Sequence, residues 1–357
     1  MKSSLTSGTL LLAALVAGGG ALLHAETWEV VVTGLNNPRG LAFGPEGALY
    51  IAEAGSGGAG PCAPGPEGIR CYGDTGAISR YDPRTGSIEA VVTGLPSLAT
   101  EGSFATGPHH VSLQGRGNLF FTIGFGGNPA LRETQFGDAG SNFARIGRAT
   151  PSGSWRLQED LGAFEIGSNP TGDEVDSNPY GLLALPGKRI VADAGANALL
   201  EIGTNRHIRA LATFPNSPNP WDAVPTSVTR GPDGAYYVSQ LTGFPFPVGG
   251  ANVYRVPAEG GTPTIYASGF THIVDLAFGP DGSLYVLEIA ENGLLDAFGT
   301  FNFDGALLRV APDGTRTELL DGVLFAPGGL AIDGKGAIYV TNNGILSGAG
   351  EVIKIQP

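Results

Sequence analysis

The sequence predicts an all-β fold, a six-bladed β-propeller, and three observations support this prediction. A segment made of an apolar strand, a Gly/Pro/Asp turn and an aromatic or β-branched strand recurs six times along the chain. Two further strands follow each of the first five copies, and repeats of four strands are typical of propeller blades. A strand near the N-terminus belongs to none of these copies, so it is available to close a ring.

The copies align over their whole length. Equivalent positions in the second strand are Tyr50, Phe120, Ile190, Tyr237, Tyr285 and Tyr339. They lie 70, 70, 47, 48 and 54 residues apart, and insertions explain the two wider spacings. The first two strands of the copies occupy 38–53, 108–123, 179–193, 225–240, 273–288 and 327–342. Third strands are expected at 77–81, 144–149, 198–202, 252–256, 306–310 and 351–355, and fourth strands at 88–93, 155–159, 207–213, 264–267 and 317–320.

The sixth copy has no fourth strand of its own. Residues 29–35 (EVVVTGL) resemble 89–95 (EAVVTGL), which form the fourth strand of the first copy. We therefore expect an N-terminal strand at about 28–34 to complete the last blade. Closing the ring in this way removes the open edges of the sheets.

The first 25 residues read as a signal peptide. Lys2 precedes the short apolar run at 10–16, and Ala25 offers a small residue before a cut. A transmembrane anchor is the alternative, but the apolar stretch at 9–23 is short for a bilayer and contains three consecutive glycines. The prediction is a single propeller domain at 26–357, exported to the periplasm or the cell exterior, with no membrane span in the mature chain.

The net charge and the two cysteines limit the kinds of molecule that the protein is expected to bind. The formal net charge is −13 and no basic stripe is visible, which argues against nucleic acid and anionic membranes as partners. Cys62 and Cys71 are the two cysteines, and they lie in a Gly/Pro-rich loop. In an exported chain this pattern favours a disulfide. A two-thiol metal site is the alternative, although no nearby histidine or further thiol completes it.

The long loops fall on one face of the predicted propeller. Turns between first and second strands are tight and rich in glycine. Loops between second and third strands share the opposite face with the blade connections, and the long ones are 54–76, 124–143, 241–251, 289–305 and 343–350. Their segregation favours a surface that binds a small molecule or a protein. The alternative is that insertions accumulated on this face only because they do no harm there, without any binding role.

Polar residues at the starts of the inner strands should meet at the mouth of the central channel on that face. The candidate binding residues are Arg39, His109, His110, Tyr180 and Asp275. Three of them, His109, His110 and Asp275, are also candidates for catalysis, because histidine and carboxylate groups transfer protons. The alternative is that these side chains only hydrogen-bond to their neighbours.

A second ring of polar residues ends the second strands. Glu53, Asp193, Glu288 and Asn342 could hold Ca²⁺ or another divalent metal through their oxygens. The alternative is that each bonds to the backbone of a neighbouring blade or an adjoining loop. Asp173, Glu174 and Asp176 form an acidic loop just before the third copy, which could bind a cation; the alternative, which we favour, is that they are solvated turn residues. The chain contains no supported nucleophile elbow, P-loop, dinucleotide or H-E-x-x-H motif.

Parts of the sequence resemble known propeller families. Residues 190–197 (IVADAGAN), followed by 199–202 (LLEI), resemble an NHL repeat. Residues 224–256 and 176–187 resemble the exported ScyD/ScyE family, which is associated with gene clusters for scytonemin, an indole–phenolic pigment. That resemblance implies an exported six-bladed propeller without an established reaction. A looser similarity to SMP-30/gluconolactonase-like propellers implies a divalent metal at the channel mouth, with the second ring as its ligands.

Two functions follow as hypotheses. The first is a binding or assembly platform without enzymatic activity, linked through the resemblance to pigment biosynthesis. The second is a metal-dependent hydrolase, lactonase or lyase of the SMP-30 type with its site at the channel mouth.

Overall fold

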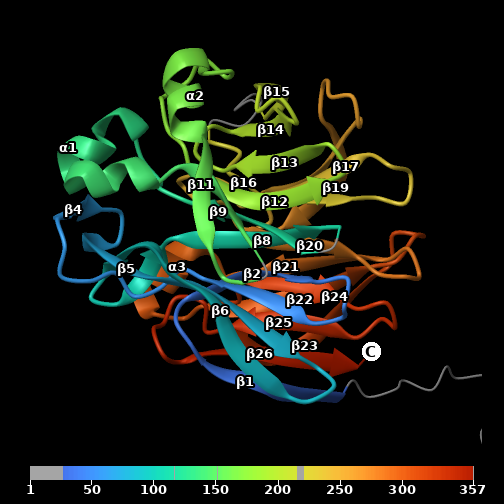
Figure 1. Cartoon of the computed structure of the whole chain (residues 1–357). Helices are drawn as coiled ribbons and strands as arrows, with labels where there is room; N and C mark the ends of the chain where they lie inside the picture. The colour runs from blue at the N-terminus through green and yellow to red at the C-terminus, as the bar shows by residue number, and fades with distance from the viewer. Residues whose placement is uncertain (1–26, 116, 151, 215–220, 357) are drawn as a thin grey trace, which may run out of the picture.

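The computed structural model describes residues 27–115, 117–150, 152–214 and 221–356. The predicted signal peptide lies outside these residues. Six antiparallel sheets account for the strands of this part of the chain (Figure 1), and the all-β propeller prediction is confirmed. No helix in the described ranges is both long enough and apolar enough to cross a membrane.

The first three sheets follow one another along the chain. Sheet 1 contains β2 (Pro38–Phe43), β3 (Leu49–Glu53), β4 (Cys62–Gly65), β5 (Gly68–Asp82), β6 (Ser87–Thr100) and β7 (Ser103–Thr106). Sheet 2 contains β8 (Pro108–Gln114), β9 (Asn118–Ile123), β10 (Arg145–Ala149) and β11 (Trp155–Asp160). Sheet 3 contains β12 (Pro179–Leu185), β13 (Lys188–Asp193), β14 (Ala198–Gly203) and β15 (Ile208–Thr213).

The other three sheets repeat this plan. Sheet 4 contains β16 (Pro225–Arg230), β17 (Tyr236–Gln240), β18 (Ala251–Val256) and β19 (Thr264–Phe270). Sheet 5 contains β20 (Ile273–Phe278), β21 (Leu284–Glu288), β22 (Asp304–Val310) and β23 (Arg316–Phe325). Sheet 6 contains β24 (Gly329–Ile332), β25 (Ile338–Asn342), β26 (Gly350–Gln356) and β1 (Thr27–Leu35).

The sheets close into a ring. The innermost strands β2, β8, β12, β16, β20 and β24 contact one another in that order, and β24 contacts β2 again. The N-terminal strand β1 pairs antiparallel with β26, from Thr27 opposite Gln356 to Leu35 opposite Gly350. The predicted closure by an N-terminal strand is therefore confirmed.

The hydrophobic core lies between neighbouring sheets rather than at one centre. Each pair of adjacent sheets encloses its own apolar cluster, and the cluster with Val32 and Leu41 joins sheet 6 to sheet 1. The second strands are buried on both faces, as in β17, where all five residues are buried. This explains why they read as continuous apolar or aromatic runs. Outer strands such as β19 are mostly exposed.

The loop-bearing face holds more regular structure than the sequence predicts. Strands β4 and β7 and the long ends of β5 and β6 lie where loops are expected, because β5 continues to pair with β6 as far as Cys71 opposite Ala99. Short helices occupy other insertions: η1 (Pro129–Leu131), α1 (Arg132–Phe136), η2 (Gly137–Asn142), α2 (Leu161–Ser168) and α3 (Leu294–Thr300). Figure 1 places β4, α1 and α3 together on one side of the molecule.

The predicted disulfide is confirmed. Cys62 and Cys71 face each other across the β4–β5 hairpin and are joined by an S–S bond. Arg70 fastens this hairpin to the next sheet, because its guanidinium donates to the carbonyl of Phe125 at 2.6 Å and lies 5.0 Å from the centre of that ring. The hairpin is thereby held beside the mouth of the central channel.

Candidate functional site

A pocket of about 500 Å³ opens at the channel mouth on the loop-bearing face. We call it the mouth pocket. Its polar lining comes from Arg39, Glu67, His109, Asn178 and Tyr180. Its apolar lining comes mainly from loops and comprises Pro66, Phe104, Ala105, Leu241, Phe246, Val274, Ile289, Leu294, Phe298, Phe303 and Ile345, with Thr106 beside them. The pocket therefore has one polar side and one broad apolar side.

Arg39 is the cation of the polar side. It is the second residue of β2, and only 8% of its surface is exposed. Its Nη2 donates a 2.8 Å hydrogen bond to the carbonyl oxygen of Ala105. Its Nε is buried and has no hydrogen-bond partner in the described part of the chain. The guanidinium thus keeps donor capacity beside the pocket.

His109 and Tyr180 form a stacked pair next to Arg39. Their ring centres are 4.5 Å apart, with the planes tilted by 37°. The His109 Nδ1 lies 3.3 Å from the carbonyl oxygen of Pro179, so this nitrogen carries the proton and donates. Burial, and then the nearby positive charge of Arg39, lower the pKa of His109 to about 3. The imidazole is therefore neutral at physiological pH and a weak proton acceptor.

His110 and Asp275 do not line the mouth pocket. The ring of His110 packs against Gly40, where an added Cβ would lie 2.2 Å from its Cδ2. The carboxylate of Asp275 accepts hydrogen bonds from the hydroxyl of Ser227 at 2.6 Å and from the backbone amide of Leu330 at 2.8 Å. Asp275 therefore ties together the inner strands of sheets 4, 5 and 6. Burial raises its pKa.

The four candidate metal ligands share one structural role. Each accepts a hydrogen bond of 2.7–2.8 Å from a backbone amide at the end of the preceding sheet or in the connection that follows it: Glu53 from Asn36, Asp193 from Asn178, Glu288 from Thr271 and Asn342 from Phe325. Within the described ranges, no three His, Cys, Asp or Glu side chains are grouped so that they could hold a metal. Asp176 likewise accepts from the amide of Gly127. Backbone amides therefore occupy oxygens of all five residues, and the divalent metal site stays a prediction.

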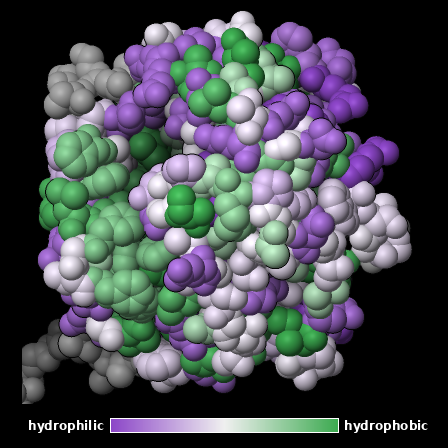
Figure 2. All heavy atoms as spheres, turned by 90° about the vertical axis from the view of Figure 1, so that its left-hand side faces the viewer, coloured by the Kyte–Doolittle hydropathy of each residue, from purple (hydrophilic) through white to green (hydrophobic). Residues whose placement is uncertain are grey.

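An aromatic collar surrounds the apolar side of the mouth pocket, and its residues are not among those predicted from the sequence. The collar comprises Phe104, Phe244, Phe246, Phe298, Phe301 and Phe303. Phe244, Phe298 and Phe301 are 72%, 49% and 54% exposed. Phe298 and Phe303 pack edge to face with their ring centres 5.5 Å apart. Figure 2 shows hydrophobic side chains gathered on the left of this face.

The signal that could have revealed the collar is the placement of phenylalanine within two of the long loops. FPFPVGG at 244–250 and DAFGTFNF at 296–303 place aromatic residues where solvent-exposed loops ordinarily carry polar ones. Large exposed apolar patches of this kind mark sites of interaction.

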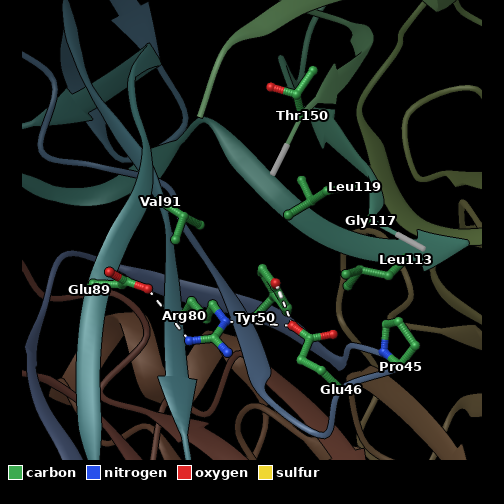
Figure 3. A pocket seen from close by; sticks show the side chains of 10 residues that line it. All are labelled: Pro45, Glu46, Tyr50, Arg80, Glu89, Val91, Leu113, Gly117, Leu119 and Thr150. Atoms are coloured by element: carbon green, nitrogen blue, oxygen red, sulfur yellow. Dashed lines mark hydrogen bonds and ion pairs between the residues drawn. The ribbon is translucent and has the colours of Figure 1, made fainter. Parts of the chain in front are cut away.

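A second pocket of about 570 Å³ lies between sheets 1 and 2, beside the tight turn at Pro45 and Glu46 (Figure 3). Its polar groups bond to one another. The Tyr50 hydroxyl donates to Glu46 at 2.7 Å, and Arg80 lies 3.5 Å from both Glu46 and Glu89. Unlike the mouth pocket, this crevice has its charges paired internally.

Comparisons with known proteins support the fold. No protein-family model matches the chain, and no curated protein matches it. Virginiamycin B lyase from Staphylococcus aureus aligns with a TM-score of 0.52 at 15% identity, covering 93% of this chain and 99% of that one. A gluconolactonase from Xanthomonas campestris aligns with a TM-score of 0.54 at 8% identity, covering 92% and 88%. Aldose sugar dehydrogenase from Streptomyces coelicolor, in its PQQ-bound form, aligns with a TM-score of 0.54 at 12% identity, covering 93% and 98%. At these identities the likeness concerns the propeller fold alone.

Proposed function

We propose that the protein binds a small, largely apolar molecule in the mouth pocket and serves as an exported binding or assembly platform. The observation that carries this proposal is the mouth pocket itself, which gathers aromatic and aliphatic side chains from several sheets around about 500 Å³. Pockets of this size with a broad apolar wall and few polar groups are typical of small-molecule sites. The disulfide between Cys62 and Cys71 supports an oxidising location such as the periplasm or the cell exterior.

A fluorescence titration of the mature chain with N-phenyl-1-naphthylamine, an uncharged aromatic dye, tests this proposal. The double variant Phe246→Ala/Phe298→Ala should weaken binding at least about tenfold, because both rings line the pocket and buried aromatic contacts dominate binding energy. The matched control is Tyr266→Ala, which removes an aromatic residue that is 43% exposed on the outer strand β19. Equal affinity for wild type and the double variant would contradict the proposal.

The resemblance to the ScyD/ScyE family narrows the proposal to a planar aromatic metabolite, such as an intermediate of scytonemin-type pigment biosynthesis. The aromatic collar supports this, because phenylalanine rings pack well on flat aromatic molecules. The gene neighbourhood provides a test. Genes for indole and phenolic chemistry beside this one would support the link, and their absence would remove its basis.

The second candidate is catalysis at the same mouth, as a hydrolase, lactonase or lyase. It is favoured by structural neighbours that include a lyase and a gluconolactonase. Because the second-ring residues bond to the backbone, the ionisable groups of the pocket lining that could act on a substrate are Arg39, Glu67, His109 and Tyr180. Turnover of lactones and cyclic esters, measured with and without chelator on wild type and Arg39→Met, tests this candidate together with any need for metal.

A further inference from the structure

Arg39 is a buried positive charge that no carboxylate of the described residues contacts directly, and Glu67 acts on it only electrostatically. None of the ion pairs in the described part of the chain involves it. Among the described residues it donates to the carbonyl of Ala105 and also interacts with the Tyr180 side chain, but its Nε has no partner, although a guanidinium has five N–H groups to donate. A buried charge without a partner lowers stability, so an unpaired arginine at a pocket calls for an explanation.

The other buried arginines show how this fold satisfies such a group. Arg132 donates to both carboxylate oxygens of Asp160, at 2.9 and 2.5 Å. Arg70 donates to two backbone carbonyls and lies over the rings of Phe125 and Phe136. Arg39 has neither a carboxylate partner nor an aromatic ring beneath its guanidinium within the described residues. It also differs in position, because it alone of the three lines the mouth pocket.

The surroundings of Arg39 leave its charge directed at the pocket. His109 is neutral, since burial and Arg39 lower its pKa. Glu67 is the one carboxylate in the pocket lining, but it lies on the exposed tip of the β4–β5 hairpin and forms no ion pair with Arg39. Asn178 and Tyr180 add uncharged polar groups beside it. The polar side of the pocket is thus a buried cation beside neutral donors and acceptors, with one carboxylate, Glu67, at the exposed rim.

We propose that the mouth pocket takes an aromatic anion, a planar apolar molecule with a carboxylate, sulfonate or phenolate group, and that Arg39 binds this group. The inference rests on the proposed function and names the chemical class of its ligand. The apolar body lies against Phe246, Phe298 and Phe303, and the charged end reaches the guanidinium. Arginine suits this role because its planar fork donates two parallel hydrogen bonds to an oxyanion.

A matched pair of dyes tests the inference on the mature chain. The anion 8-anilino-1-naphthalenesulfonate has the aromatic body of N-phenyl-1-naphthylamine plus a sulfonate. Wild type should bind the anion at least about tenfold more tightly than the neutral dye, which is the usual gain from a charged hydrogen bond. Arg39→Met should abolish this preference, so that the two dyes bind with similar affinity. Arg39→Lys should keep part of the preference, and Arg80→Met in the other pocket should keep all of it.

Further readouts keep the outcomes distinct. Circular dichroism confirms that each variant is folded. If Arg39→Met does not fold, Glu67→Gln takes its place, because removing the carboxylate from the pocket rim should raise affinity for the anion and not for the neutral dye. Equal preference for the anion in wild type and Arg39→Met, or no response to Glu67→Gln, overturns the inference. If Phe246→Ala/Phe298→Ala leaves the affinity for both dyes unchanged, the proposed function is overturned instead.

Discussion

The hydroxyl of Thr341 donates a 2.8 Å hydrogen bond to the backbone carbonyl oxygen of Arg39, across a separation of 302 residues. This bond fastens the second strand of sheet 6 to the first strand of sheet 1. Thr122 makes the equivalent bond from sheet 2 to the carbonyl of Tyr180 in sheet 3, also at 2.8 Å. Ring closure and the mouth pocket therefore share a residue, since Arg39 and Tyr180 both line the pocket.

Replacing Thr341 with valine should lower the free energy of unfolding by about 1–3 kcal/mol. The substitution keeps the shape of the side chain but leaves a buried carbonyl without its donor. Urea unfolding of wild type and Thr341→Val measures the difference. Thr262→Val, at an exposed loop position, is the control and should change little. A midpoint for Thr341→Val equal to that of the control would show that the bond does not stabilise the closure.

Removing β1 should destabilise the whole ring. A chain that begins at residue 36 loses the partner of β26 and the buried side chains of Val32 and Leu35, each contributing about 2 kcal/mol. We expect the melting midpoint to fall by roughly 10 °C or more. The double variant Trp28→Ser/Val30→Ser changes two exposed residues of the same strand and should melt close to wild type. An unchanged midpoint for the shortened chain would be incompatible with closure by β1.

Stability should fall as the pH rises from about 4.5 to 7, because of Glu165 in α2. Both of its carboxylate oxygens are buried without hydrogen-bond partners in the described ranges, and burial raises its pKa to about 7. The folded state therefore holds a proton that the unfolded state releases near its ordinary pKa, and the penalty grows as pH rises through this window.

Glu165→Gln removes that penalty. The variant should match wild type at pH 4.5 and exceed it by about 1–3 kcal/mol at pH 8, measured by urea unfolding at the two values. Glu174→Gln, at an exposed position in the following loop, should leave the pH dependence unchanged. Parallel curves for wild type and Glu165→Gln would show that Glu165 does not set the pH dependence.

Loss of the disulfide should affect the pocket rim more than the ring. Cys62 and Cys71 close a short hairpin whose tip carries Pro66 and Glu67 into the mouth pocket. We expect Cys62→Ser/Cys71→Ser to shift the melting midpoint by only a few degrees, since Ala63 is the one residue of 62–71 in the described apolar cluster that joins sheets 1 and 2. Proteolysis within 62–71 should accelerate, because the hairpin tip loses its crosslink. Mass spectrometry of limited digests locates the cuts, and an unchanged cutting pattern would contradict the expectation.

The fold could be predicted from the sequence because the residues that specify each blade lie close together in the chain and recur six times. Each copy carries a glycine-containing turn and a strand buried on both faces, so the pattern survives in single segments. The similarity between EVVVTGL at 29–35 and EAVVTGL at 89–95 also identified the closing strand, although its partner lies at the far end of the chain.

The candidate site was only partly accessible, because it depends on contacts between distant loops. Arg39, His109 and Tyr180 follow from their positions at strand starts, and the structure brings them together. Glu53 and Asp193 are polar at the predicted positions, but only the structure shows that their oxygens bond to backbone amides. The collar was missed because Phe246 and Phe298 come from different loops, whose convergence no local pattern records.

Because β1 and β26 are the first and last described strands, their pairing can form only at the end of synthesis. Glu29 and Lys354, which form an ion pair across this seam, are separated by 325 residues. Strand β1 is therefore synthesised long before its partner β26. Until β26 is made, the ring cannot close and β1 has no strand to pair with. Strand β26, which closes the ring by pairing with β1, is synthesised last. A chain that ends before β26 therefore cannot close the ring. Distant pairing of this kind slows folding, so the last step of folding is expected to be the pairing of β1 with β26.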